Sequence, residues 1–304
     1  WIPVPFVVNS PGPTFNVLGS DNGVPMLQIE GTDPATGEPI QQDEAQSRPY
    51  DAPAKPGQGQ QRMVSASESG NPTSRLNFAQ LIAAYFDPHS KIRDYESVYP
   101  AGTTREQVSD AQVAMMRNSQ TTSQVAALEY LGWDVPATIT IEGAVEGSNA
   151  EGKVEQGDIL RAITTPDGVR HEITSAATPF ALMRSVPAGS TMTLTVERGG
   201  TTQDISFDSV AASATESGSK LGVYLSADPV LPVDITVNID GVGGPSAGMM
   251  FSLGIIDRLT PGDMTGGNVI AGTGTMSYDG QVGAIGGIQQ KLWGARRDGA
   301  QWFL

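Results

Sequence analysis

Cysteine is absent from the 304-residue sequence, and histidine is almost absent. Without cysteine there are no disulfides, no thiol nucleophile and no cysteine-bound metal. The two histidines, His89 and His171, lie far from the glycine-rich motifs described below, and neither belongs to a His/Asp/Glu cluster. A zinc site and a Ser-His-Asp triad are therefore not expected, and we expect no metal and no cofactor.

Positive charge is scarce as well. The chain has 18 Lys and Arg residues against 33 Asp and Glu residues, which gives a formal net charge of −15. This charge disfavours nucleic acid, or an anionic membrane surface, as the main partner. No Gly-x4-Gly-Lys-Ser/Thr motif occurs, and the length leaves no room for an ATPase module beside the other parts. No hydrophobic run is long enough to cross a membrane.

The two ends of the chain are apolar. Residues Trp1–Val8 contain two prolines but neither an initiator methionine nor a signal peptide. We therefore expect an ectodomain that follows a membrane anchor absent from this chain. The last residues, Gln301–Leu304, have the composition of a strand interior, so we expect the chain to stop inside its last domain. A length of 304 residues is enough for two domains.

One glycine-rich stretch, Gly244-Pro-Ser-Ala-Gly248, places a serine between two predicted elements. The β-branched, nearly alternating residues Val233–Ile239 predict a strand before it, and Ala247–Leu259 has helical spacing after it. This order presents Ser246 Oγ at a helix N-terminus, where free backbone N–H groups and the helix dipole favour developing negative charge. The alternative is a serine N-cap on an ordinary helix.

A second stretch predicts a helix that carries a lysine. Residues 286–297 have their apolar side chains on one stripe, formed by Ile288, Leu292 and Ala295, and Lys291 lies at the edge of this stripe. Burial would disfavour the ammonium and lower its pKa, so that the neutral amine could take a proton from a serine. The alternative is a lysine whose stem is buried while its head stays in water.

Together the two stretches resemble the proteolytic domain of Lon-type endopeptidases. The resemblance covers Pro232–Leu304, and it rests on Gly244–Gly248, Ala271-Gly-Thr-Gly274, Gly280-Gln-Val282 and Ile285-Gly-Gly-Ile-Gln-Gln-Lys291. It implies a Ser-Lys dyad with Ser246 as nucleophile and Lys291 as general base, supported by Thr273. The backbone N–H groups of Ser246 and Ala247 would bind the oxyanion. Many ATP-dependent Lon enzymes carry an acidic residue directly before Gly-Pro-Ser, where this chain has Gly243.

The N-terminal residues, 1–125, are predicted to form a region of mixed helices and strands. Strands are expected at Val4–Leu18, where Ser10–Pro13 interrupts the pattern, and at Arg62–Glu68. Residues 31–61 are rich in Pro, Gln, Asp and Gly, which predicts a long loop or a disordered insertion.

Two helices are predicted in the same region. The first is amphipathic and spans Leu76–Phe86, with core contacts expected from Leu76, Leu81, Ala84 and Tyr85. The second starts at Thr103, which has capping-box spacing to Glu106, and it runs to Gly132. A polar tract, Asn118–Ser123, interrupts its apolar pattern.

From about Tyr130 to Phe207, short predicted strands alternate with turns around one short helix at Pro179–Ser185. The predicted strands are Ala137–Ile141, Gly157–Ile163, Met192–Arg198 and Gln203–Phe207. The segment resembles a PDZ domain of the bacterial protease-associated kind through Gly157-Asp-Ile159, Pro187-Ala-Gly-Ser190 and Val196-Glu-Arg-Gly199. Such a domain binds an extended peptide by adding it as a strand beside a helix.

The segment Tyr130-Leu131-Gly132-Trp133 is the candidate for the loop that captures a chain-terminal carboxylate in this PDZ-like domain. The alternative is an ordinary helix C-terminus with Gly132 at the C′ position.

These patterns predict an α+β fold in four parts. Residues 1–125 form the N-terminal region, 126–208 the PDZ-like β-rich domain, and 209–220 a linker rich in small residues. Residues 221–304 form a Lon-proteolytic-type α/β domain with an incomplete C-terminus.

The order of these parts, without an ATPase, resembles the YlbL-like branch of the Lon superfamily. The resemblance implies an ATP-independent serine endopeptidase that is anchored in a bacterial membrane, with its soluble part on the extracytoplasmic side. Its substrates would be unfolded or exposed segments of exported or membrane-tethered proteins, bound in part by the PDZ-like domain. Lon-like domains often form rings, so the resemblance implies a homo-oligomer, with a hexamer as the expected ring.

Two other functions fit the sequence. One is a peptide-binding PDZ scaffold whose protease-like domain is catalytically silent, although the presence of both Ser246 and Lys291 favours the enzyme. The other is an acidic chaperone that uses Met249-Met250-Phe251 as an apolar surface.

Overall fold

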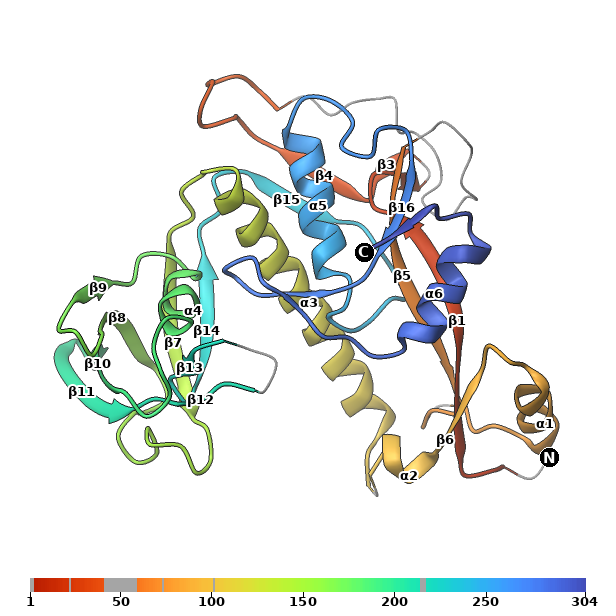
Figure 1. Ribbon diagram of the computed structural model, residues 1–304, viewed down its shortest axis with the longest axis horizontal. Coiled ribbons are helices and arrows are strands. Elements are labelled where there is room, and N and C mark those ends of the chain that lie inside the picture. Colours follow the sequence, from red (N-terminus) through yellow and green to blue (C-terminus); the bar gives the residue numbers. More distant parts are fainter. Residues whose placement is uncertain (1–2, 22, 41–58, 73, 101, 214–216) are drawn as a thin grey trace. The chain divides into compact units, whose positions relative to one another are not determined.

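The computed structural model describes residues 3–21, 23–40, 59–72, 74–100, 102–213 and 217–304 (Figure 1). The chain divides into two compact units. Unit 1 combines residues up to 127 with residues 233–276 and 282–304, and unit 2 combines residues 128–232 with residues 277–281. Three sequence predictions fall partly outside the described residues: the loop at 31–61, the apolar N-terminal segment at 1–8 and the linker at 209–220.

Unit 1 is built on a mixed sheet of the strands β1 (Phe6–Asn16), β5 (Gln60–Ser69), β6 (Lys91–Asp94), β16 (Val269–Gly272) and β19 (Trp302–Phe303). Their order is β19-β16-β5-β1-β6, and Figure 1 shows the long strands β1 and β5 side by side. β1 is antiparallel to β5 and β6, whereas β16 is parallel to β5 and β19. The N-terminal part of the chain therefore supplies the middle of this sheet.

β1 continues through the segment Ser10–Pro13, which the sequence predicted to interrupt it. The ladder to β5 instead shifts its register between Pro11 and Thr14, because proline has no N–H to donate. The strands β1 and β5 approach closely at this point, since a Cβ on Gly12 would lie 2.3 Å from Ser65 Oγ.

The helices of unit 1 are α1 (Phe78–Phe86), α2 (Tyr95–Val98), α3 (Arg105–Tyr130, up to residue 127), α5 (Gly248–Leu259) and α6 (Ile288–Arg297). The capping box of α3 lies one residue later than predicted. Thr104 Oγ1 accepts a hydrogen bond from Gln107 N, and Gln107 Oε1 accepts one from Thr104 N. Thr103 with Glu106 and Thr104 with Gln107 both fit the motif, so spacing alone could not separate them.

α1 has no buried residue. Leu76, just before the helix, is buried as predicted, and Leu81 and Ala84 are half-buried. The prediction for Tyr85 is wrong, because its side chain is 76% exposed.

Short ladders complete unit 1, namely β2 (Ser20–Asp21) with β3 (Val24–Pro25), β4 (Leu27–Glu30) with β15 (Asp234–Val237), and β17 (Thr275–Met276) with β18 (Val282–Gly283). β15 and α5 confirm the strand and the helix predicted on either side of Ser246.

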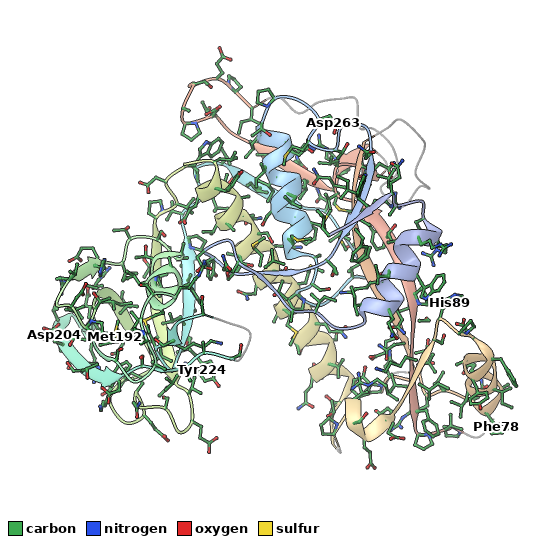
Figure 2. All side chains as sticks on the ribbon, viewed as in Figure 1. Phe78, His89, Met192, Asp204, Tyr224 and Asp263 are labelled. Atoms are coloured by element: carbon green, nitrogen blue, oxygen red, sulfur yellow. The ribbon has the colours of Figure 1, made fainter. Side chains whose placement is uncertain are left out.

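Unit 2 contains β7 (Ala137–Ala144), β8 (Asp158–Thr164), β9 (Arg170–Glu172), α4 (Thr178–Met183), β10 (Thr191–Arg198), β11 (Thr201–Asp208) and β14 (Val223–Pro229). The sheet order is β11-β10-β8-β7-β14, with β9 paired to β8. Figure 2 marks Met192 of β10, which is buried, and Asp204 of β11, which is exposed. The strands and the helix predicted from residue 137 to residue 207 are confirmed, and both units mix helices and sheets as in an α+β fold.

A buried ion pair fixes the entry into β8. The Asp158 carboxylate is almost inaccessible and accepts two hydrogen bonds from Arg198, each 2.6 Å long. These hydrogen bonds, aided by the N–H of Glu155, lower the pKa of Asp158 despite its burial. The bidentate geometry ties the start of β8 to the end of β10.

The unit boundaries differ from the predicted ones. β14 lies in the segment assigned to the protease-like domain, but it pairs with β7 of unit 2 from Val223↔Ala144 to Pro229↔Ala137. Part of the predicted linker forms a ladder of β12 (Val210–Ala211) and β13 (Ser219–Lys220). The N-terminal region is not a separate domain either, because β16 pairs with β5, which in turn pairs with β1 in the same sheet. Strand partners this far apart in the chain leave no local pattern.

We expect residues 128–232 to fold as an isolated segment and residues 128–208 not to do so. The shorter segment lacks β14, so one edge of β7 loses its hydrogen-bond partners and the core loses a strand. Thermal unfolding followed by circular dichroism measures the difference. A cooperative transition at the same temperature in both segments would contradict the placement of β14 in unit 2.

Candidate active site

Ser246 lies in a turn directly before α5. The N-cap residue of α5 is Ala247, and no side chain caps the helix, so the Ser246 hydroxyl is not used for capping. Gly244 enters the turn with a φ of 87°, a left-handed conformation that glycine adopts without a steric penalty. The interpretation of Ser246 as an ordinary N-cap is therefore wrong.

The polar tract of α3 holds this turn in place. Ser119 Oγ donates to the carbonyl oxygen of Pro245 over 3.0 Å, and Ser123 Oγ donates to that of Gly248 over 2.8 Å. Ser252 Oγ of α5 in turn donates to the carbonyl oxygen of Ser123. The two helices approach so closely that a Cβ on Gly248 would lie 2.9 Å from Ser119 Oγ. The tract that interrupts the apolar pattern of α3 thus supports the backbone around Ser246.

α6 turns a different face to the sheet from the one predicted. Its buried residues are Gln290, Lys291, Gly294 and Ala295. Ile288 and Leu292, which we expected on the core stripe, are 43% and 44% exposed. The helix approaches β1 through its smallest residue, since a Cβ on Gly294 would lie 2.9 Å from the carbonyl oxygen of Gly12. This close approach places Lys291 on the buried face of α6, and its side chain lines the cavity described below.

The three residues Ser246, Thr273 and Lys291 meet at one point. Lys291 is only 4% exposed, and its Nζ lies 2.7 Å from Ser246 Oγ and 3.0 Å from Thr273 Oγ1. Burial lowers the pKa of the Lys291 amine from its ordinary value of 10.5 to about 8. The alternative of a lysine with a solvated head is therefore wrong.

The hydrogen bonds of Thr273 orient the amine. Thr273 Oγ1 donates its proton to the carbonyl oxygen of Ser246 over 3.0 Å, and Gly274 N donates to the same oxygen over 2.9 Å. With its only proton used, the Thr273 hydroxyl can only accept from Lys291 Nζ. A neutral amine that donates to Thr273 keeps its lone pair free to accept the proton of Ser246.

Two backbone N–H groups at the turn are available to bind an anion. Within the part of the chain that the structure describes, the N–H groups of Ser246 and Ala247 donate to no protein acceptor. The bond from Ser119 to the Pro245 carbonyl fixes one side of the peptide plane, so the Ser246 N–H is directed to the opposite side. This geometry fits the oxyanion site predicted at these two residues.

A cavity of about 1020 Å³ in unit 1 opens onto Ser246. Its walls include residues 63–68 of β5, the turn 240–247 and the segment 284–287 before α6. The ladder between β16 and β5 ends at Gly272↔Met63, and no described strand continues it along the same edge of β5. An extended segment could therefore lie along this wall of the cavity.

The space beside Gly243 is filled by α3. A Cβ on Gly243 would lie 2.9 Å from Gln112 Cβ, and Gly244 N donates to the Gln112 carbonyl oxygen. Glycine is therefore the residue that lets the turn rest on α3.

The structure also describes two other segments for which a binding surface was predicted. Trp133 N donates to the Leu128 carbonyl oxygen and Gly132 N to that of Glu129, with Gly132 at a φ of 79°. This is the Schellman end of α3, so Tyr130-Leu131-Gly132-Trp133 forms a helix C-terminus, and its role as a carboxylate-binding loop stays a prediction. Met249-Met250-Phe251 is buried and offers no apolar surface to a client protein.

No helix in the described ranges has both the length and the apolarity needed to span a bilayer. Likewise, no group of three or more His, Asp or Glu side chains in those ranges is placed to hold a metal ion.

We expect Lys291→Met to stabilise the protein at pH 7. With a folded pKa of about 8 against 10.5 when unfolded, the unfolded chain binds more protons between these values. The buried ammonium then costs up to about 3 kcal/mol below pH 8, and this cost disappears as the pH rises towards 10.5. Thermal unfolding at pH 7 and at pH 10 measures it, with Ser246→Ala as the control. An increase in stability that is equal at both pH values would contradict the buried charge.

Comparison with known proteins bears on the C-terminal part of the chain. Residues 188–304 match the sequence model of the Lon protease (S16) C-terminal proteolytic domain. Among solved structures, the PDZ domain of an SdrC-like protein from Listeria innocua covers 29% of this chain and 92% of its own, with 17% identity and a TM-score of 0.25. That likeness is weak, so the PDZ-like character of unit 2 stays a prediction. No curated protein matches the chain. The family match spans Ser246, Thr273 and Lys291, and it supports a Lon-type serine protease.

Proposed function

We propose that the chain is an ATP-independent serine endopeptidase with a Ser-Lys dyad. The observation that carries this proposal is the 2.7 Å separation of Ser246 Oγ and the buried Lys291 Nζ. At pH 7, a lysine with a pKa of 10.5 is neutral in about one molecule in 3000, whereas a pKa of about 8 leaves about one in ten neutral. Burial therefore supplies the base that a serine nucleophile needs.

The proposed reaction begins with attack of Ser246 Oγ on the scissile carbonyl carbon, while Lys291 Nζ takes the hydroxyl proton. The N–H groups of Ser246 and Ala247 bind the oxyanion of the tetrahedral intermediate. Collapse of this intermediate expels the amine, which receives the proton from Nζ and leaves an acyl-enzyme. A water molecule then attacks the ester with Lys291 again as base, which restores the free Ser246 hydroxyl.

We further propose that the substrates are unfolded or exposed polypeptide segments. The supporting observation is the free edge of β5 along the cavity, where residues 64–68 have backbone groups for an added strand. A folded protein would need an unfolding step before a segment of it could lie along this edge.

The proposal for the cellular setting rests on the resemblance to membrane-anchored Lon-like proteins. We propose that exported or membrane-tethered proteins are the substrates, on the extracytoplasmic side of a bacterial membrane. The PDZ-like unit 2 would bind part of the substrate, and the protease domain would assemble into a homo-oligomeric ring.

We expect peptidase activity on an unstructured protein to rise with pH through about 8, as Lys291 loses its proton. Ser246→Ala and Lys291→Ala each lower kcat/KM by about 10⁴-fold or more, and the double variant is hardly worse, because the two groups act as a unit. Lys291→Arg is equally inactive, since a guanidinium stays protonated. Thr273→Ala costs about tenfold, because Thr273 orients the amine without taking the proton.

The assay contains a chelator and no nucleotide. Full activity of Lys291→Arg, or activity that needs ATP or a metal ion, would reject the dyad. Absence of any Ser246-dependent activity in the wild-type chain would instead favour the peptide-binding scaffold with a silent protease-like domain.

We also expect Ser119→Ala to lower kcat by about tenfold with little change in KM. The loss of its hydrogen bond frees the Pro245 carbonyl, and the Ser246 N–H is then less well directed at the oxyanion. Thr121→Ala is the matched control, because the Thr121 hydroxyl bonds within α3 to the Arg117 carbonyl. Steady-state kinetics of the two variants decide the matter, and equal effects would remove Ser119 from the mechanism.

A further inference from the structure

The hairpin of β17 and β18 joins two residues of the candidate active site. Thr273 precedes β17, and the chain that leaves β18 leads through residues 284–287 into α6 and Lys291. The stem is paired through Thr275↔Gly283 and Met276↔Val282. It also contacts the serine turn, because a Cβ on Gly248 would lie 3.0 Å from Met276 N. A shift of this hairpin would therefore move the residues around the Ser-Lys pair.

The tip of the hairpin belongs to unit 2, although its stem belongs to unit 1. Residues 277–281 form a tight turn in which Ser277 N donates to the Gln281 carbonyl oxygen and Gly280 N to that of Ser277. Ser277 Oγ donates to the Asp279 carboxylate within the same turn. The tip is thus a small preformed element. Contacts that fix the position of the tip therefore also restrict the strands of the stem.

Helix α4 of unit 2 binds this tip at two points. Arg184, the C-cap residue of α4, pairs with the Asp279 carboxylate and donates to the Asp279 carbonyl oxygen over 3.2 Å. The Asp279 side chain is only 5% exposed, so the guanidinium is its main compensation for lost water. Beside this pair, the rings of Phe180 and Tyr278 lie with their centroids 5.8 Å apart. Burial of this contact raises the pKa of Tyr278.

We propose that Arg184 and Phe180 are positioning residues for the Ser-Lys site, and that unit 2 is for this reason a working part of the protease. The inference rests on the proposed function. Catalytic groups must keep their geometry to within about 0.5 Å. The hairpin between Thr273 and Lys291 is held at its tip by the Arg184–Asp279 pair, and the burial of the Asp279 carboxylate makes this contact specific.

The test compares Arg184→Ala and Asp279→Ala with the wild-type chain on a fluorescently labelled unstructured protein. We expect kcat to fall by about 10- to 100-fold with KM changed by less than about twofold. The double variant Arg184→Asp, Asp279→Arg restores part of the lost activity. The pH at which activity is half-maximal moves above about 8 in the single variants, because water gains access to Lys291. A variant whose fold is merely destabilised would keep this pH midpoint, and charge reversal would not restore its activity.

Arg170→Ala is the matched control, because its pair with Glu172 is exposed and lies elsewhere in unit 2. Thermal unfolding checks that each variant is folded. If Arg184→Ala does not fold, Arg184→Lys is used instead. Lysine keeps the charge but cannot donate to both acceptors on Asp279, so we expect kcat to fall by about threefold.

The outcomes separate the two proposals. A wild-type chain with no Ser246-dependent activity overturns the proposed function and this inference with it. Ser246-dependent activity that is the same within twofold in the wild-type chain, Arg184→Ala and Asp279→Ala overturns the inference alone.

Discussion

The burial of the Lys291 amine is the constraint on which the rest of the site depends. A charged ammonium at this position is costly, so the side chain must be compensated by hydrogen bonds or lose its proton. The structure provides both routes, with hydroxyl groups of Ser246 and Thr273 beside Nζ and a pKa lowered to about 8. In the proposed mechanism, stability is given up at the position where reactivity is needed, which is common at catalytic sites.

The scaffold that buries this amine comes from both ends of the chain. β1 and β5 form the surface under α6, and α6 can approach them because Gly294 rests against Gly12. α3 contributes from the other side through Ser119 and Ser123, whose hydroxyls bind carbonyl groups of the serine turn. The N-terminal region is consequently part of the same unit as the candidate active site. Its polar tract contacts the serine turn through directed hydrogen bonds and not through apolar packing.

Division into two units does not separate their roles. The hairpin that links Thr273 to Lys291 gives its stem to one unit and its tip to the other. Arg184 and Asp279 form an ion pair within unit 2 whose carboxylate is buried, and such a pair is specific because breaking it leaves a buried charge. A change in unit 2 therefore has a physical route to the serine and the lysine through a few residues of backbone.

The sequence by itself determined most of the local elements and pointed to the candidate residues of the site. β-Branched alternation, helical spacing and glycine punctuation located β15, α5, α6 and the strands β7, β8, β10 and β11 of unit 2. The paired motifs singled out Ser246 and Lys291, and the family resemblance added Thr273. Only the tertiary structure decided which face of α6 is buried, that β14 joins β7, and that Ser119 supports the turn. These features depend on partners distant in the chain. Close packing at glycine and strand pairing have no local periodicity from which they could be predicted.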